Sequence, residues 1–218
     1  MYERYIKRLL DIMVSGFSII ILSPLLAVIS LAIVIDDPGP VFFRQKRIAK
    51  DSKEGRKQFF NILKFRTMKT STPPNMPTHL LTDPAQFITK VGSFLRRTSL
   101  DELPQLINIF LGQMSIVGPR PALYNQDDLY FERSKHGANA VIPGLTGLAQ
   151  VLGRDGLEIR DKAKIDGEYS QNISFRLDIK CILMTIQAVL KREGVVEGGT
   201  GELKRQAKQM SGSVKKED

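Results

Sequence analysis

An uninterrupted apolar stretch near the start is the strongest hydrophobic pattern in the chain. No charged side chain occurs from Ile12 to Ile35, and the stretch is closed by Asp36, Asp37 and the rigid turn Pro38-Gly39-Pro40. As an α-helix it would be about 36 Å long, which exceeds the roughly 30 Å hydrocarbon core of a bilayer. A cleaved signal peptide fits less well, because no Ala-x-Ala-like site follows the stretch. The pattern therefore predicts a membrane-inserted helix.

The dipeptide Ser23-Pro24 divides this stretch into two halves, Ile12–Leu22 and Leu25–Ile35. Each half would be about 16 Å long as a helix, which reaches roughly half-way through a bilayer. Pro24 lacks an amide donor and its ring clashes with the carbonyl four residues earlier, so a bend is expected there. The Ser23 hydroxyl is placed to satisfy a freed carbonyl. We therefore expect Ser23 and Pro24 to form the break of a membrane hairpin.

Basic residues flank both ends of the apolar stretch. Since Lys and Arg favour the cytoplasmic side of a membrane, the flanks place both ends on the same side. A helix–break–helix hairpin that enters and leaves through one membrane face satisfies both flanks and leaves the rest of the chain cytoplasmic. A kinked span is the alternative, because prolines are tolerated in transmembrane helices. The flanking residues are Arg4, Lys7 and Arg8 before the stretch, and Arg44, Lys46, Arg47, Lys50 and Lys53 after it.

Shorter patterns in the rest of the chain predict a small β element and several helices. A short strand is expected at 41–43 and a second at 58–68, separated by a charged hairpin loop at 50–57. Apolar periodicity predicts helices at 84–97, at 104–111 with Gly112 as C-cap, and at 175–192. The apolar stripe of the last helix is more typical of core than of membrane contact. The proline-rich segment 70–84 is either a functional lid or a surface loop.

These elements predict an α+β fold: an N-terminal re-entrant membrane helix hairpin on a compact, mainly helical cytoplasmic domain with a small β element and surface amphipathic helices. We expect residues 1–36 to form the membrane-associated helix, 37–193 the cytoplasmic catalytic domain, and 194–218 a flexible linker and tail. With 42% hydrophobic and 25% charged residues, the 218-residue chain is neither wholly disordered nor a polytopic membrane protein. Its net charge of +9 suits partners that carry phosphate.

The segment 96–106 contains the densest group of residues that can carry chemistry. Asp101 and Glu102 follow Arg96 and Arg97 closely. Phosphoryl transfer needs hard oxygen ligands for Mg²⁺, cations for the spread negative charge and a nucleophile, and carboxylates form acyl phosphates. The alternative is structural, because Ser99-x-x-Glu102 has the spacing of a helix capping box. The local pattern alone favours neither interpretation.

Three further basic positions are candidates for binding phosphate. Arg120 stands between Pro119 and Pro121, which makes its backbone stiff and suits a preorganised guanidinium. Lys64 and Arg66 alternate in a strand pattern and so share one face. The alternatives are an incidental surface arginine and a solvated sheet face. The turn-rich segment 143–150 either offers amides to a ligand or is a structural turn.

Taken together, these segments resemble the bacterial sugar transferase family, the small monotopic phosphoglycosyl transferases that begin glycoconjugate assembly on polyprenol phosphate. The resemblance extends over residues 7–191. The motifs that carry it are Lys7-Arg8-x-x-Asp11, Ser23-Pro24, Gly39-Pro40-Val41-Phe42-Phe43-Arg44-Gln45, Lys64-Phe65-Arg66-Thr67-Met68, Arg97-Thr98-Ser99-Leu100-Asp101-Glu102-Leu103-Pro104-Gln105, Met114-Ser115-x-Val117-Gly118-Pro119-Arg120-Pro121 and Pro143-Gly144-Leu145-Thr146-Gly147.

The resemblance implies transfer of a sugar 1-phosphate from a UDP-sugar to undecaprenyl phosphate, with release of UMP and dependence on Mg²⁺. It implies that Asp101 attacks the β-phosphate to form a covalent intermediate, and that Glu102, with Asp101, holds Mg²⁺. The basic positions that it carries over as phosphate contacts are Lys64, Arg66, Arg97 and Arg120. The match of Ser23-Pro24 to the break of the family's re-entrant helix favours the hairpin over the kinked span.

The implied donor is a UDP-N-acetylated sugar or a UDP-hexose, and the implied location is the cytoplasmic face of the bacterial inner membrane. Membrane lipid is an expected partner, a homodimer is left open, and no nucleic-acid partner is expected, because no nucleic-acid motif is present. The main rival hypothesis is a non-catalytic, membrane-anchored module that binds anionic lipid or nucleotide, which would need the basic groups but no nucleophile.

Overall fold

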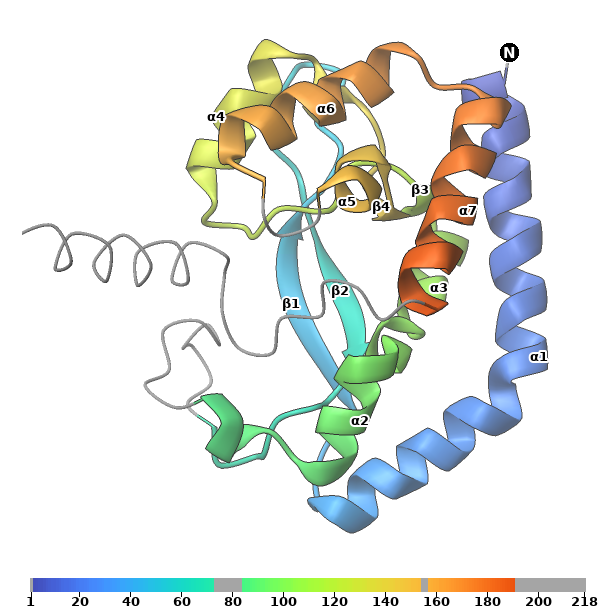
Figure 1. The fold of residues 1–218 in the computed structure, drawn as a ribbon, viewed down its shortest axis with the longest axis vertical. Helices are drawn as coiled ribbons and strands as arrows, with labels where there is room; N and C mark the ends of the chain where they lie inside the picture. Colours follow the sequence, from blue (N-terminus) through green and yellow to red (C-terminus); the bar gives the residue numbers. More distant parts are fainter. Residues whose placement is uncertain (1, 73–83, 154–156, 191–218) are drawn as a thin grey trace, which may run out of the picture.

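The computed structural model describes residues 2–72, 84–153 and 157–190, which form the expected α+β fold (Figure 1). The flexible linker and tail expected at 194–218 and most of the proline-rich segment 70–84 lie outside the described residues. In chain order the elements are a π-helical turn η1 (Tyr2–Ile6), α1 (Lys7–Asp36), β1 (Phe42–Ile48), β2 (Phe59–Phe65), the 3-10 turn η3 (Pro84–Phe87), α2 (Lys90–Thr98), the 3-10 turn η4 (Leu100–Glu102), α3 (Gln105–Phe110), β3 (Ser115–Val117), α4 (Asp127–Lys135), the 3-10 turn η5 (Ala138–Ala140), β4 (Gly144–Thr146), α5 (Leu148–Leu152), α6 (Ile159–Gln171) and α7 (Phe175–Leu190).

The apolar stretch forms one helix, α1, which is long and apolar enough to cross a membrane. Figure 1 shows α1 as two stretches joined by a bend, with the rest of the molecule on the inner side of that bend. Helical structure continues through Pro24, so the expected break is a bend inside a continuous helix. The Ser23 hydroxyl donates to the carbonyl of Ile20 at 2.8 Å, which is the carbonyl that the missing amide of Pro24 leaves free. Ser23 therefore satisfies the freed carbonyl, as the sequence predicts, whereas the membrane hairpin itself stays a prediction.

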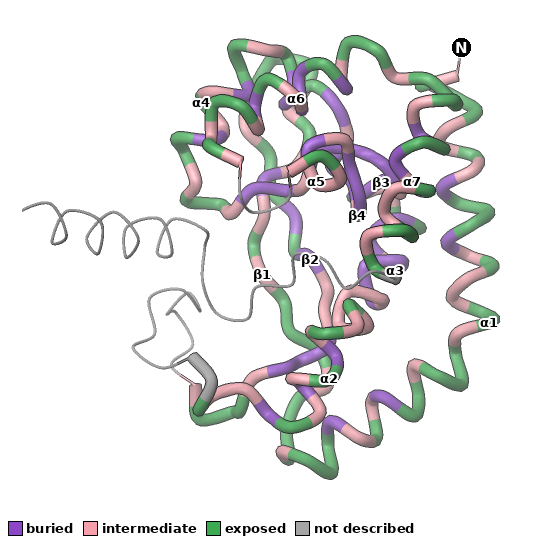
Figure 2. Tube along the Cα trace, viewed as in Figure 1, coloured by how far each residue is buried: buried purple, intermediate pink, exposed green. Residues whose placement is uncertain are grey.

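Both halves of α1 pack on the folded domain through their inner side. Ile19 and Leu22 contact a cluster from β2 and α3 that contains Phe60 and Ile109. Further along, Ile33 and its neighbours pack in a second cluster with residues of β2 and α2. Most of the helix surface elsewhere is exposed or half-buried (Figure 2). The exposed apolar side chains of α1 include Ile12, Met13, Phe17, Ile20, Ile21, Leu25, Val28, Leu31 and Ile35.

Polar contacts fasten the two ends of α1 to the same domain. At its start, Lys7 pairs with Asp178 of α7 at 2.5 Å, and Arg8 donates to the carbonyls of Ile109 and Phe110 in α3. At its end, Asp36 accepts from the amide of Val91 in α2 at 2.8 Å. The long helix therefore lies along the domain and leaves neither end free.

Two small sheets form the β element in the described chain. β1 and β2 are an antiparallel hairpin in which Phe43 pairs with Lys64 and Arg47 with Phe60. β1 is longer than the strand expected at 41–43, because pairing continues through the basic residues to Ile48. β3 and β4 form a short parallel pair, Ser115 with Gly144 and Val117 with Thr146, which the sequence pattern did not predict.

The helical predictions are met in part. The helix expected at 84–97 is divided into η3 and α2, because Thr89 caps α2 and accepts a hydrogen bond from the Gly92 amide. The helix expected at 104–111 is α3, and Gly112 has the positive φ of a C-cap at 84°. The expectation that the stripe of α7 is core is wrong. Phe175 and Leu183 are 55% and 60% exposed, and the same helix instead buries Asp178 and Cys181 against its neighbours.

Candidate active site

Asp101 and Glu102 lie in the single 3-10 turn η4, which joins α2 to α3. This turn starts directly after α2 because Ser99 has a left-handed backbone, with φ of 57°, that reverses the chain. The Ser99 side chain makes no capping hydrogen bond, so the capping-box alternative for Ser99 and Glu102 is wrong. Both carboxylates are therefore available to form a site.

Glu102 is held by two cations that come from different parts of the chain. Its Oε1 lies 2.7 Å from Nζ of Lys64 in β2 and 3.0 Å from Nη2 of Arg120, which follows β3. Burial raises the pKa of Glu102, but attraction from Arg120 and Lys64 outweighs it and holds the pKa far below the usual carboxyl range. Glu102 is therefore ionised at neutral pH and is the anion that joins Lys64 to Arg120.

Asp101 has a different environment, although it is adjacent in sequence. Its Oδ2 is 3.8 Å from Nζ of Lys64, its side chain is 13% exposed, and its carboxylate accepts no hydrogen bond from the residues that the structure describes. Burial raises the pKa of Asp101; the charge of Lys64 opposes this effect and the charge of Glu102 adds to it. Two neighbouring carboxyl groups with pKa values displaced in opposite directions are typical of a pair with divided chemical roles.

The parallel pair β3–β4 positions Arg120. The amide of Gly118 donates to Thr146 at 2.8 Å, and the amide of Gly144 donates to the carbonyl of Pro119 at 2.9 Å. A Cβ on Gly144 would lie 2.1 Å from the Gly118 amide nitrogen, so two backbones meet here at a distance that only glycine allows. The turn-rich segment expected at 143–150 is thus structural, and two of its backbone groups are used to hold the Arg120 segment.

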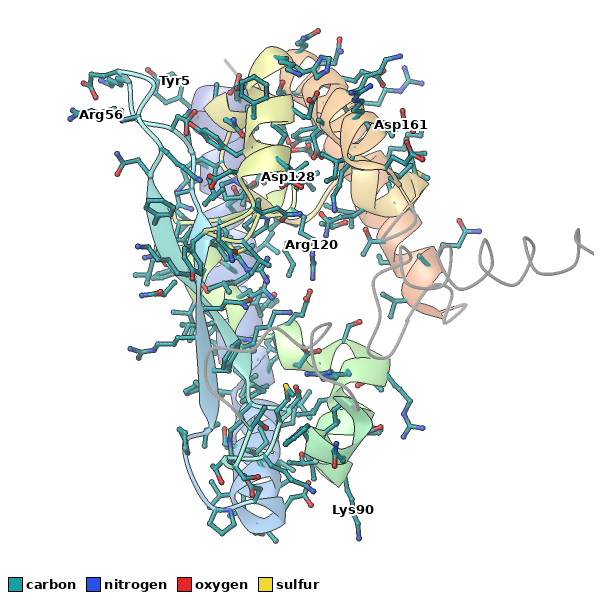
Figure 3. The ribbon with its side chains drawn as sticks, turned by 90° about the vertical axis from the view of Figure 1, so that its left-hand side faces the viewer. Tyr5, Arg56, Lys90, Arg120, Asp128 and Asp161 are labelled. Atoms are coloured by element: carbon teal, nitrogen blue, oxygen red, sulfur yellow. The ribbon has the colours of Figure 1, made fainter. Side chains whose placement is uncertain are left out.

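Figure 3 shows Arg120 between the half of the molecule that carries Asp128 of α4 and the half that carries Lys90 of α2. Lys64 reaches the same place from the β-hairpin. Asn108 of α3 ties the hairpin to the helix that follows the acidic pair, because its side chain accepts from the amide of Leu63 and donates to the carbonyl of Asn61, both at 2.9 Å. The site therefore lies where the hairpin, η4 and the segment after β3 meet.

Two of the expected basic residues lie elsewhere. Arg66 is buried and donates to the Asp37 side chain and carbonyl and to the carbonyl of Pro40 at 2.6 Å, so it joins β2 to the end of α1. Arg97 is exposed in the last turn of α2. Its neighbour Arg96 attracts the Asp101 carboxylate and donates to the Thr67 hydroxyl at 2.8 Å. The structure therefore groups Lys64, Arg96 and Arg120, and not Arg66, with the acidic pair.

Sequence reasoning named Arg96 beside the acidic pair but did not choose it as a phosphate contact, and it did not place Arg47 of β1 in the site. The pKa of Arg47 is lowered by burial and by the charge of Arg120. For Arg47 a signal existed, because residues 43, 45 and 47 alternate with their neighbours and lie on the hairpin face that carries Lys64 once the strands are paired. For Arg96 no signal separated it from Arg97 before the helix was placed.

The acidic pair provides a donor set that suits Mg²⁺. No group of three or more His, Cys, Asp or Glu side chains able to hold a metal occurs in the part of the chain that the structure describes. Mg²⁺ is commonly bound by one or two carboxylates together with water and substrate phosphates. Asp101 and Glu102 meet that requirement, whereas a site for a transition metal would need more nitrogen or sulfur ligands.

The chain is similar to known bacterial proteins over nearly its whole length. A family model described as "Bacterial sugar transferase" matches residues 2–192. An uncharacterized sugar transferase of Haemophilus influenzae is 38% identical over 88% of this chain and 42% of its own length. The UDP-glucose:undecaprenyl-phosphate glucose-1-phosphate transferase of Escherichia coli is 40% identical over 84% of this chain and 40% of its own length. The chain thus spans less than half of these two relatives, but 87% of the exopolysaccharide production protein ExoY of Sinorhizobium fredii, at 35% identity.

Proposed function

Because the chain belongs to the bacterial sugar transferase family, we propose that it is a phosphoglycosyl transferase that moves a sugar 1-phosphate from a UDP-sugar to undecaprenyl phosphate and releases UMP. Relatives from Escherichia coli, Klebsiella pneumoniae and Caulobacter vibrioides are named for UDP-glucose, which makes this sugar the first donor to test.

One observation carries the proposal: the two adjacent carboxylates are bound differently. Glu102 is tied to Lys64 and Arg120 at 2.7 and 3.0 Å, whereas Asp101 lies beside Lys64 at 3.8 Å and accepts no hydrogen bond from a described residue. The lone pairs of Asp101 are therefore available to attack phosphorus. The cations around it stabilise the negative charge that spreads over the transferred phosphoryl group.

In the first step, Asp101 attacks the β-phosphorus of the UDP-sugar. A new bond forms between a carboxylate oxygen and phosphorus, and the bond from this phosphorus to the oxygen that bridges to the α-phosphorus breaks. The bridging oxygen leaves with the electron pair as part of UMP. Arg120 and Lys64 are placed to hold phosphate oxygens during this step, because both point to the carboxylate next to the nucleophile.

In the second step, an oxygen of undecaprenyl phosphate attacks the same phosphorus and displaces the Asp101 carboxylate. The products are undecaprenyl-diphospho-sugar and the free enzyme. A bound Mg²⁺ would neutralise charge on the diphosphate of the donor, and Asp101 and Glu102 are the residues that would hold it. Glu102 can do so only by sharing its oxygens between the ion and the two cations that bind it in this structure.

We further propose that α1 enters and leaves the membrane through the cytoplasmic face of the inner membrane. Its two ends bind the same domain, through Lys7 with Asp178 and through Asp36 with the Val91 amide. A helix that crosses the bilayer would carry its ends to opposite sides, where one polar domain cannot contact both. The outer side of the bend presents apolar side chains to lipid, and the exposed stripe of α7 supplies a second apolar surface. This arrangement places the lipid phosphate and the soluble nucleotide at one membrane surface.

The decisive experiment incubates the full chain in detergent with UDP-glucose and Mg²⁺, with and without undecaprenyl phosphate, and follows UMP. Asp101→Asn should abolish UMP release, and Asp161→Asn, a change of the same chemistry at an exposed site on α6, should leave it unaffected. Mass spectrometry of wild type with donor alone should find hexose phosphate on the peptide that contains Asp101. Full turnover by Asp101→Asn would refute Asp101 as the nucleophile, and a wild-type chain that binds the donor but releases no UMP would favour the non-catalytic binding module.

Topology is tested by cysteines introduced at Tyr2 and Asp51. Both should be labelled from the cytoplasmic side, and labelling from opposite sides would restore the kinked span.

A further inference from the structure

Arg47 of β1 is a guanidinium that the proposed reaction does not yet use. Its Nη1 donates to the carbonyl of Pro121 at 3.0 Å, and its Nη2 donates to the side chain of Gln45 at 2.6 Å. Its Nε is buried without a hydrogen-bond acceptor in the structure. Arg47 is therefore attached to the residue that follows Arg120, and it keeps one buried donor that no protein atom satisfies.

The charge of Arg47 has no carboxylate partner of its own among the described residues. Burial and, to a smaller extent, the charge of the neighbouring Arg120 lower its pKa to about 10, although the charge of Glu102 acts in the opposite direction. Glu102 is already shared by Lys64 and Arg120. Placing a half-buried guanidinium beside that of Arg120 costs free energy unless an anion compensates it.

The local balance of charge shows which ligand would provide that compensation. Four cations, Lys64, Arg96, Arg120 and Arg47, surround the two carboxylates of Asp101 and Glu102. Among the residues that the structure describes, these four cations outnumber the two carboxylates even when both carboxylates are ionised. A diphosphate carries two negative charges and several acceptor oxygens, so it both restores the balance and offers an acceptor to Arg47.

We propose that Arg47 is an anion-binding residue of this site, which acts with Arg120 as a pair of guanidiniums that hold the diphosphate of the donor. The identity of the diphosphate as that of a UDP-sugar rests on the proposed function; the anion site itself does not. The Pro121 carbonyl fixes the spacing of the two guanidiniums, because it links Arg47 directly to the segment that carries Arg120.

A structural role is the competing explanation. Arg47 would then only brace the chain at Pro121, and a neutral donor would serve equally well. The two roles differ in what they predict for a ligand that needs no turnover, and inorganic pyrophosphate is such a probe.

The experiment measures pyrophosphate binding to the full chain in detergent by titration calorimetry, with EDTA present so that only protein groups contribute. Arg47→Gln should weaken binding by about 10- to 100-fold, as expected for the loss of a charge-assisted contact. Arg47→Lys keeps the charge without the planar fork and should lose about 3- to 10-fold. Arg44→Gln removes an exposed arginine from the opposite face of the same strand and should change affinity less than about twofold.

Two results would overturn the inference: wild-type protein that does not bind pyrophosphate, or Arg47→Gln and Arg47→Lys that both bind it as wild type does. An Arg120→Gln background separates direct from indirect action. Arg47→Gln should weaken binding further in that background, and the absence of any further loss would show that Arg47 acts only through the Arg120 segment. Wild-type protein that never releases UMP but binds pyrophosphate in an Arg47-dependent manner would refute the proposed reaction and leave the anion site standing.

Discussion

The junction between α1 and β2 provides a quantitative test of how α1 is attached to the folded domain. Arg66 donates to the side chain and carbonyl of Asp37 and to the carbonyl of Pro40, and its side chain is 8% exposed against 21% for Asp37. Arg66→Ala would leave a carboxylate and two carbonyls without their donor. Arg66 itself is buried, and the loss of hydrogen bonds to a charged group costs about 1.5–3 kcal/mol, so Arg66→Ala should cost about 3 kcal/mol.

This loss should be visible as a change in melting temperature. For a protein of this size each kcal/mol corresponds to a shift of about 2–4 °C, so Arg66→Ala should melt about 6–12 °C below wild type. The assay is thermal unfolding followed by far-ultraviolet circular dichroism in a fixed detergent. Lys69→Ala, which removes an exposed cation three residues further along, should shift the transition by less than about 2 °C.

A double-mutant cycle then assigns the effect to the contact. Asp37→Ala and Arg66→Ala should be strongly non-additive, because the second change removes a group that has already lost its partner. Additive shifts would refute the attachment of α1 through this pair. If Arg66 instead contacts substrate phosphate, as the sequence pattern suggested, Arg66→Lys would weaken pyrophosphate binding without lowering the melting temperature.

Four other consequences of the geometry can be measured directly. Ser99 has a left-handed backbone, so Ser99→Val should destabilise the protein by about 2 kcal/mol while Ser99→Gly changes it by less than about 1 kcal/mol, as read from melting temperatures. Because the pKa of Asp101 is raised, the acid limb of the pH–rate profile for UMP release should lie above the ordinary carboxyl range, and Glu102→Gln should move it to lower pH; an unmoved limb would contradict the coupling. The folded state also binds more protons than the unfolded state between the ordinary and the raised pKa, so wild type should lose stability relative to Asp101→Asn as pH rises through that window. Gly118→Ala places a Cβ 2.5 Å from the carbonyl oxygen of Ile142, which should cost about 1–3 kcal/mol and lower UMP release by displacing the Arg120 segment; equal stability of the variant would argue against the close backbone approach.

Local signals predicted the elements whose boundaries are marked by individual residues. Gly112 ends α3 and Pro24 bends α1, because each residue acts on the backbone at its own position. The family resemblance likewise identified Asp101 and Glu102 before any geometry was known. The contacts of Glu102 then confirmed its proximity to Lys64 and Arg120, which are far from it in sequence.

The features that escaped prediction depend on contacts between distant segments. β3 and β4 have three residues each, too few to show a period, and they exist as strands only because glycines let their backbones approach. The stripe of α7 has the same pattern whether it faces a core or a lipid surface, so its exposure was not readable from its period. Sequence reasoning grouped Arg66 and Arg97 with the acidic pair on the basis of charge. Charge alone does not reveal that Arg66 is hydrogen-bonded to Asp37.

The contacts at the two ends of α1 can form only at a late stage of protein synthesis. Translation completes α1 before it reaches the residues that fasten the helix, such as Arg66, Val91 and Asp178. In the arrangement that we propose, the nascent helix therefore reaches the bilayer before the contacts that fasten it can form. The orientation of the helix would then be set first by lipid contacts and flanking charge. The contacts of the finished domain would hold the helix in that orientation.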